Sequence, residues 1–136
     1  MILGFDPGRD KCGMALMDLN KQLYYREVVD SSTVTITIKA LSQKYNISLV
    51  VIGDQTTSKM WKQNLTQIIS PTVPIIKIDE RYSSLEARDR YWQIYPPKGF
   101  FYLIPRGMRI PPRPVDDIVA MILIERYLEN FLEVSS

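Results

Sequence analysis

The chain has 136 residues and a formal net charge of +2, from 17 Lys and Arg against 15 Asp and Glu. This length predicts one domain over residues 1–136, and the near-balanced charge neither requires nor excludes a polyanionic partner. The single cysteine excludes an internal disulfide framework. The absence of histidine excludes serine-type and cysteine–histidine hydrolase sites and most zinc sites, so any catalysis must rest on carboxylates, lysines and arginines.

Hydropathy gives no sign of a membrane protein. No run approaches the roughly eighteen apolar residues that a membrane span needs, and the chain does not open on a signal-peptide pattern. We therefore expect a cytoplasmic protein with no membrane contact.

The first part of the chain has the pattern of three antiparallel strands. Residues 1–5 are apolar and predict a short buried strand that stops at Asp6, before a Pro7–Gly8 turn. Residues 13–18 predict its neighbour, and residues 23–29, rich in Tyr and Val, predict the third strand.

The segment from Val34 to Tyr45 fits two structures. Its apolar residues alternate with threonines as in a strand, yet they also fit one face of a helix. We favour the helix, because residues 49–53 are a continuous apolar run typical of a buried parallel strand, and parallel strands need a crossover connection.

The remaining chain alternates helix and strand. Residues 59–69 predict a helix, residues 73–78 a buried strand, and a capping box of Ser83 and Glu86 starts a helix that runs to about Tyr95. Six of the nine prolines lie between residues 96 and 114 and predict a long loop, and residues 115–131 predict a helix packed into the core. This order predicts an α/β fold around one mixed sheet.

Acidic residues recur where apolar strands end. Asp6, Asp54 and Glu80 each follow such a strand, and the last helix can present Asp116 to the same edge of the sheet. Each acid alone has an ordinary explanation as a turn cap, a surface ion pair or a helix-dipole partner. Together they repel one another unless a cation binds, and ligand sets made only of oxygen favour Mg²⁺ or Mn²⁺ and phosphoryl chemistry.

Four motifs in order resemble the RNase H-like nucleases of the RuvC and YqgF group, and the YqgF-like branch most. This group contains crossover junction resolvases and rRNA-precursor nucleases. The matching residues are Asp6–Pro7–Gly8 with Gly13 and Ala15, Val51–Ile52–Gly53, Asp79–Glu80–Arg81–Tyr82–Ser83 with Glu86–Ala87, and Val115–Asp116–Asp117–Ile118–Val119–Ala120 with Ile122–Leu123 and Tyr127–Leu128. The resemblance implies an RNase H-like fold, with a mixed sheet of three antiparallel strands followed by parallel strands and flanked by helices.

The resemblance also implies that Asp6, Glu80 and Asp116 are catalytic carboxylates that bind Mg²⁺ or Mn²⁺ for two-metal hydrolysis of a phosphodiester. Asp54 competes with Glu80 for one ligand position, and the sequence context favours Glu80. Asp117 is a further candidate ligand. Gly8 and Gly13 are then expected to leave room beside Asp6 for a metal-bound phosphate.

Residues 91–115 contain no acid and mix cations with aromatic side chains, which is the composition of a nucleic-acid contact surface. The candidate substrate-binding residues are Lys11, Arg81, Lys98, Arg106, Arg109 and Arg113. Position 113 is an arginine where resolvases carry an acid.

The leading hypothesis is a metal-dependent endonuclease that acts on structured or precursor nucleic acid. The alternative is a nucleic-acid-binding protein on the same fold with weak catalysis. A third, a nucleotide-binding fragment of the actin and sugar-kinase type, is disfavoured by the length of the chain. Junction resolution needs two sites related by two-fold symmetry, so a homodimer stays open.

Overall fold

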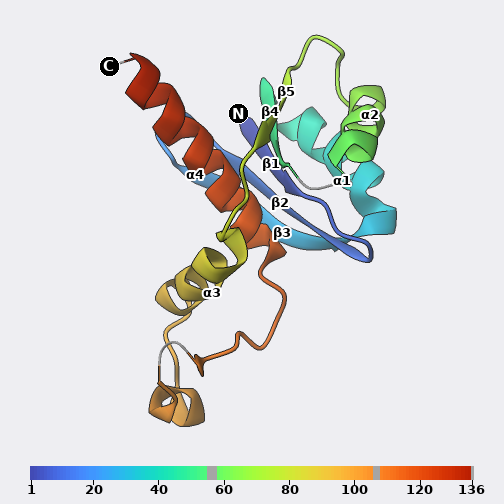
Figure 1. Ribbon diagram of the computed structural model, residues 1–136. Helices are drawn as coiled ribbons and strands as arrows, with labels where there is room; N and C mark the ends of the chain where they lie inside the picture. The colour runs from blue at the N-terminus through green and yellow to red at the C-terminus, as the bar shows by residue number, and fades with distance from the viewer. Residues whose placement is uncertain (55–57, 106–107, 136) are drawn as a thin grey trace.

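The computed structural model describes residues 1–54, 58–105 and 108–135. Its centre is a five-stranded sheet with strand order β3-β2-β1-β4-β5 (Figure 1). The strands are β1 (Ile2–Asp6), β2 (Lys11–Met17), β3 (Leu23–Asp30), β4 (Leu49–Gly53) and β5 (Ile75–Ile78). The first three pair antiparallel, and β1, β4 and β5 pair parallel. The prediction of an α/β fold around a mixed sheet is confirmed, and the architecture is consistent with an RNase H-like fold.

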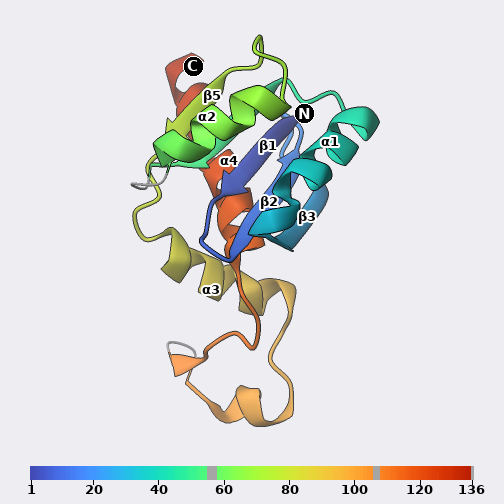
Figure 2. The ribbon, with the colours of Figure 1, turned by 90° about the vertical axis from the view of Figure 1, so that its right-hand side faces the viewer.

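Helices cover both faces of this sheet (Figure 2). The helices are α1 (Val34–Lys44), α2 (Ser58–Ile68), α3 (Ser83–Ile94) and α4 (Asp116–Ser135), with short 3-10 turns at Ser31–Thr33 and Gly99–Leu103. Residues of α1 and α2 share one apolar cluster with Leu3 and Phe5, whereas α3 and α4 share another with Ile2. Successive residues of β1 therefore face opposite layers, as the alternation of a strand requires.

The segment that fitted both a strand and a helix is the helix α1, as predicted. Val34, Ile38 and Leu41 are buried against the sheet, but Ile36 is 72% exposed. A strand that buried Val34 and Ile38 would bury Ile36 as well, so only the helical period matches this exposure.

Helix α4 lies very close to the sheet. All residues from Ile118 to Ile124 are buried, as expected for a core helix. A Cβ at Gly4 would lie 2.3 Å from the Ala120 carbonyl oxygen, and a Cβ at Gly13 would lie 1.8 Å from that of Asp116. These two glycines therefore let the backbone of α4 approach β1 and β2, and they fix where α4 begins.

The predicted capping box of α3 is wrong. Ser83 is the first residue of the helix and is buried, and the N-cap is Tyr82, in the left-handed region with φ of 62° and no side-chain cap hydrogen bond. Glu86 instead accepts a hydrogen bond from Arg126 Nη2 at 3.0 Å. A salt bridge to α4 has thus taken the side chain that the local pattern assigned to the cap.

The proline-rich segment extends beyond α3, away from the sheet (Figure 1). Arg109 fixes part of it, because its Nε donates to the Ile104 carbonyl at 2.8 Å and its Nη2 to that of Tyr102 at 3.4 Å. In the part of the chain that the structure describes, no helix is long and apolar enough to cross a membrane.

Candidate metal and active site

Asp6 and Asp116 form the centre of the candidate site. Asp6 is the last residue of β1 and pairs with Gly13 across the strands, and the first turn of α4 places the Asp116 carbonyl against Gly13. Asp6 is only 7% exposed, and its carboxyl group donates a hydrogen bond to the Asp116 carboxylate. The contact between a strand end and a helix start thus joins two acids that lie far apart in the sequence.

The electrostatics of this pair are unfavourable to ionisation. The pKa of Asp6 is raised to about 8, first by burial and then by the charges of Asp116 and Glu80. Burial also raises the pKa of Asp116, with a further contribution from the charge of Asp117. At neutral pH and without a cation, the pair therefore retains a proton.

Glu80 reaches the same end of the sheet from the loop after β5. A Cβ at Gly53 would lie 2.5 Å from the Glu80 Oε2, so this carboxylate occupies the space that the glycine leaves at the end of β4. The effect of Glu80 on the pKa of Asp6 shows that the two groups are close enough to interact. Asp6 and Asp116 are in contact, and Glu80 lies near enough to Asp6 to raise its pKa, without completing a group of three acids arranged around a metal position.

Asp54, the rival of Glu80, has a different contact. It is exposed, and its Oδ1 accepts a long hydrogen bond of 3.4 Å from the Glu80 backbone N–H. The Asp54 backbone N–H donates to the Ile78 carbonyl at 3.1 Å. These bonds join the ends of β4 and β5, and they favour a role for Asp54 in holding the loop that carries Glu80.

The donor atoms of the site suit a hard divalent cation. Carboxylate oxygens are the ligands that Mg²⁺ and Mn²⁺ prefer, and a cation can replace the proton that Asp6 and Asp116 share. Among the described residues, no group of three or more His, Cys, Asp or Glu is arranged to hold a metal ion. The structure therefore provides two carboxylates in contact, and Glu80 becomes a ligand only if its side chain moves from Gly53 toward the pair.

Asp117 is engaged elsewhere. It is 3% exposed, and its Oδ1 and Oδ2 accept hydrogen bonds of 3.1 and 3.3 Å from Arg113, while Arg26 Nε lies 3.7 Å from its Oδ2. The Arg113 guanidinium also lies 5.5 Å from the ring centres of Tyr91 and Tyr95. The predicted ligand Asp117 and the predicted substrate-binding residue Arg113 thus bind each other.

The other predicted substrate-binding residues lie in varied surroundings. Lys11 Nζ is 3.0 Å from Asp30 Oδ1 in an exposed ion pair, and Arg109 binds backbone carbonyls of the proline-rich segment. Arg81 and Lys98 are exposed, and Arg106 lies outside the described residues. Arg81 follows Glu80 in the sequence and lines a hollow with Asp79 and Arg126, whereas Arg113 lines the hollow beside Asp116.

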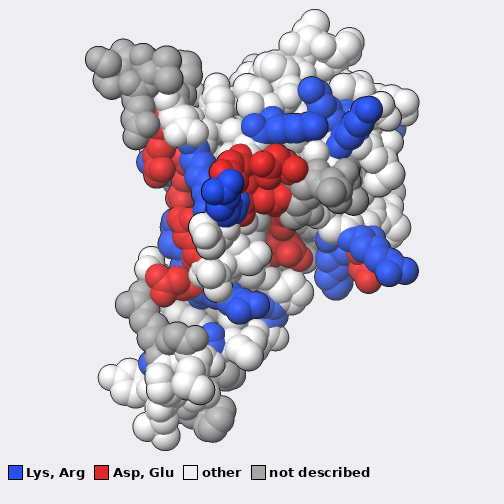
Figure 3. All heavy atoms as spheres, viewed as in Figure 1, with Lys and Arg blue, Asp and Glu red and all other residues white. Residues whose placement is uncertain are grey.

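The surface around the acids is mixed in charge. Figure 3 shows a group of acidic side chains near the end of the sheet, with Lys and Arg side chains on several sides. A hollow of about 280 Å³ lies beside Asp116, lined also by Arg88 and Ile110. Sequence reasoning missed Arg88, because nothing in the local pattern separates it from the other arginines of α3.

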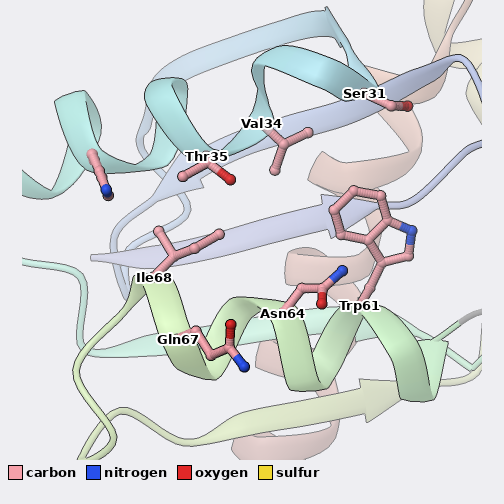
Figure 4. A pocket seen from close by; sticks show the side chains of 8 residues that line it. Ser31, Val34, Thr35, Trp61, Asn64, Gln67 and Ile68 are labelled. Carbon is pink, nitrogen blue, oxygen red and sulfur yellow. The ribbon is translucent and has the colours of Figure 1, made fainter.

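A second hollow, of about 390 Å³, lies on the opposite face between α1 and α2 (Figure 4). The side chains of Trp61, Asn64 and Gln67 line it from α2. Its lining contains no acid, and the sheet separates it from α4, so it is not part of the acidic site.

Comparison with known proteins adds little to this description. No family model matches the chain, and no curated protein sequence matches it significantly. Among solved structures, that of a putative sugar kinase from Cytophaga hutchinsonii ATCC 33406 matches 68% of the chain with 13% identity and a TM-score of 0.45. The matched part spans 39% of that protein. A match this distant carries no argument about function, which has to be argued from the site itself.

Proposed function

We propose that this protein is a Mg²⁺- or Mn²⁺-dependent endonuclease that acts in the cytoplasm on structured or precursor nucleic acid, related to the RuvC and YqgF group. The observation that carries the proposal is the buried contact of Asp6 with Asp116, within the electrostatic influence of Glu80. Carboxyl groups clustered in this way destabilise a fold, and strongly perturbed acids in such clusters mark functional sites. A divalent cation removes the repulsion.

Asp6 and Asp116 are the residues that would hold the ion, and Glu80 would be the third ligand. When bound, Mg²⁺ activates a water molecule and stabilises the leaving oxygen of a phosphodiester. Asp6 is fixed by the β1 backbone and Asp116 by the first turn of α4, so both are positioned by rigid elements. Arg81, which is exposed and follows Glu80 in the sequence, is a candidate for binding the phosphate backbone of the substrate.

The test is cleavage of labelled substrates by the wild-type protein and single-site variants. A four-way junction, a flap and an rRNA precursor are incubated with millimolar Mg²⁺ or Mn²⁺. We expect cleavage of at least one substrate by wild type, and a loss of a hundredfold or more in Asp6→Asn, Glu80→Gln and Asp116→Asn. Wild-type protein that cuts none of them with either metal would contradict the proposal.

Asp54→Asn is the matched control, because the sequence offers Asp54 as an alternative to Glu80 for the same metal-ligand position. The structure predicts that Asp54→Asn keeps most of the activity, since this side chain contacts the loop backbone. If Asp54→Asn abolished cleavage and Glu80→Gln did not, Asp54 and not Glu80 would be the catalytic carboxylate.

A second function is a nucleic-acid-binding protein without efficient catalysis. Two observations favour it. No described group of three acids is arranged as a metal site. Position 113, where resolvases carry an acid, is an arginine that binds Asp117. A protein that shifts these substrates in a gel but cuts none of them, even with Mn²⁺, would have this second function.

A further inference from the structure

The hollow beside Asp116 lies between α3 and the end of the proline-rich segment. Asp116 and Arg88 line it together with Ser84, and Ile110, Pro111 and Pro114 form its apolar wall. Its volume of about 280 Å³ falls just below the range of roughly 300 to 1,000 Å³ that is usual for small-molecule pockets. The hollow can therefore hold one unit of a longer ligand, the rest of which extends past Asp116.

Arg88 differs from the arginines around it. Arg90, Arg113 and Arg126 each bind an acid, namely Glu125, Asp117 and Glu86. Arg88 is exposed, and its side chain makes no hydrogen bond or ion pair with any described residue. Its charge is therefore available to a ligand in the hollow.

The composition of the hollow fits a nucleotide unit. An arginine is the side chain best suited to bind a phosphate, through two parallel N–H donors. The lining also contains Arg113, which is bound to Asp117, and apolar residues, of which Ile110 is 70% exposed although it is a large hydrophobic residue. The apolar wall can cover the face of a sugar or base while the phosphate lies against Arg88.

We propose that this hollow is a nucleotide subsite in which Arg88 binds the backbone phosphate next to the one cleaved at the Asp6–Asp116 pair. The inference rests on the proposed function and specifies its substrate. A base can lie against Ile110 only when it is out of a duplex stack, so the strand is unpaired beside the cleavage point.

The role of Arg88 is tested by the salt dependence of binding. A short labelled single-stranded oligonucleotide is titrated without divalent metal, so that no cleavage occurs, at several salt concentrations. We expect Arg88→Ala to weaken binding about tenfold at low salt and to lower the slope of log K against log [salt] by about 0.7. Arg88→Lys, which keeps the charge, should retain most of the slope.

Lys39→Ala is the matched control, since Lys39 is an exposed cation on α1, across the sheet from the hollow. It should leave the slope unchanged. With a cleavable substrate and metal, Arg88→Ala should raise KM about tenfold with little change in kcat. Ile110→Ala should weaken binding to the single strand about threefold and binding to a full duplex much less.

The outcomes separate this inference from the proposed function. If wild type cleaves nucleic acid but Arg88→Ala matches Lys39→Ala in slope and in KM, the subsite is wrong and the nuclease stands. If wild type neither binds nor cleaves any strand, both fail. Equal effects of Ile110→Ala on single strand and duplex would contradict the unpaired nucleotide.

Discussion

Asp116 and Asp117 are neighbours in the sequence, yet they lie in opposite electrostatic surroundings. Asp117 lies between Arg26 and Arg113. Asp116 lies against Asp6 and has a raised pKa. The charge of Asp117 is compensated within the fold, whereas Asp116 adds charge to an acidic cluster. Two adjacent residues in the first turn of α4 are thus an acid that stabilises the protein and an acid that is useful only with a ligand.

The packing of α4 holds both acids in place. The buried residues from Ile118 to Ile124 and the close approach to Gly4 and Gly13 fix the start of the helix. Helix stability in proteins comes mainly from such packing, so it can offset the repulsion between Asp116 and Asp6. This arrangement is expected at functional sites, whose residues often lower the stability of the protein and are held in place by the packing around them.

The largest expected effect is that of Asp117→Asn. The substitution leaves the guanidinium groups of Arg26 and Arg113, 13% and 35% exposed, without their acid. We expect a loss of about 3 kcal/mol in the free energy of unfolding, at the lower end of the range for broken buried pairs because Arg113 is partly exposed. Denaturant unfolding of the metal-free protein measures it.

Asp116→Asn is the control for this comparison and should have the opposite sign. It removes a charge that repels Asp6, so the metal-free protein should gain on the order of 1 kcal/mol above neutral pH. Equal losses in the two variants would mean that the two acids do not differ as described.

The next effect is the pH dependence of stability, and Asp6 dominates it. The pKa of Asp6 is raised from 3.8 to about 8 in the folded protein, so the folded state binds this proton more tightly than the unfolded state does. The free energy of unfolding should therefore fall as pH rises through this window, by at most about 1.4 kcal/mol per pH unit. The raised pKa of Asp116 acts in the same direction.

Asp6→Asn should flatten this dependence and raise the stability at about pH 8 relative to the wild-type protein. Unfolding in denaturant at about pH 5 and about pH 8, with a chelator present, gives the slope for both proteins. A wild-type stability that is constant or increases over this range would show that the Asp6 carboxyl is not buried beside other acids.

The smallest effect is expected for an exposed pair. Lys11 and Asp30 lie 3.0 Å apart, but their side chains are 53% and 63% exposed. Lys11→Ala should change the free energy of unfolding by about 0.5 kcal/mol or less, because water screens such pairs. A change as large as that of Asp117→Asn would mean that burial does not distinguish the two pairs.

The sheet and the central acids could be predicted from the sequence, because both follow from local patterns. Continuous apolar runs indicate β1 and β4, and an acid at a strand end is placed by the strand itself. The ambiguous α1 was resolved by the need for a crossover. The contact of Asp117 with Arg26 could not be predicted, since Arg26 lies on β3 and only the packing of α4 brings it near.

The errors originate in contacts that the sequence pattern does not show. The room expected at Gly8 and Gly13 for a phosphate is filled by the protein, since a Cβ at Gly8 would lie 2.1 Å from the Lys11 carbonyl oxygen and one at Gly13 would meet Asp116. The capping box failed because Arg126, 40 residues away, binds Glu86. Local spacing identifies which residues are unusual, but not what they contact.

The central claim is that Asp6 and Asp116 bind a divalent cation, and thermal unfolding tests it most directly. Millimolar Mn²⁺ should raise the Tm of the wild-type protein by about 5 °C or more, because the ion binds only the folded state. Asp6→Asn should have the higher Tm without metal and lose the gain with it, while Asp54→Asn should keep the gain. A wild-type Tm that does not change with Mn²⁺ or Mg²⁺ would contradict the claim.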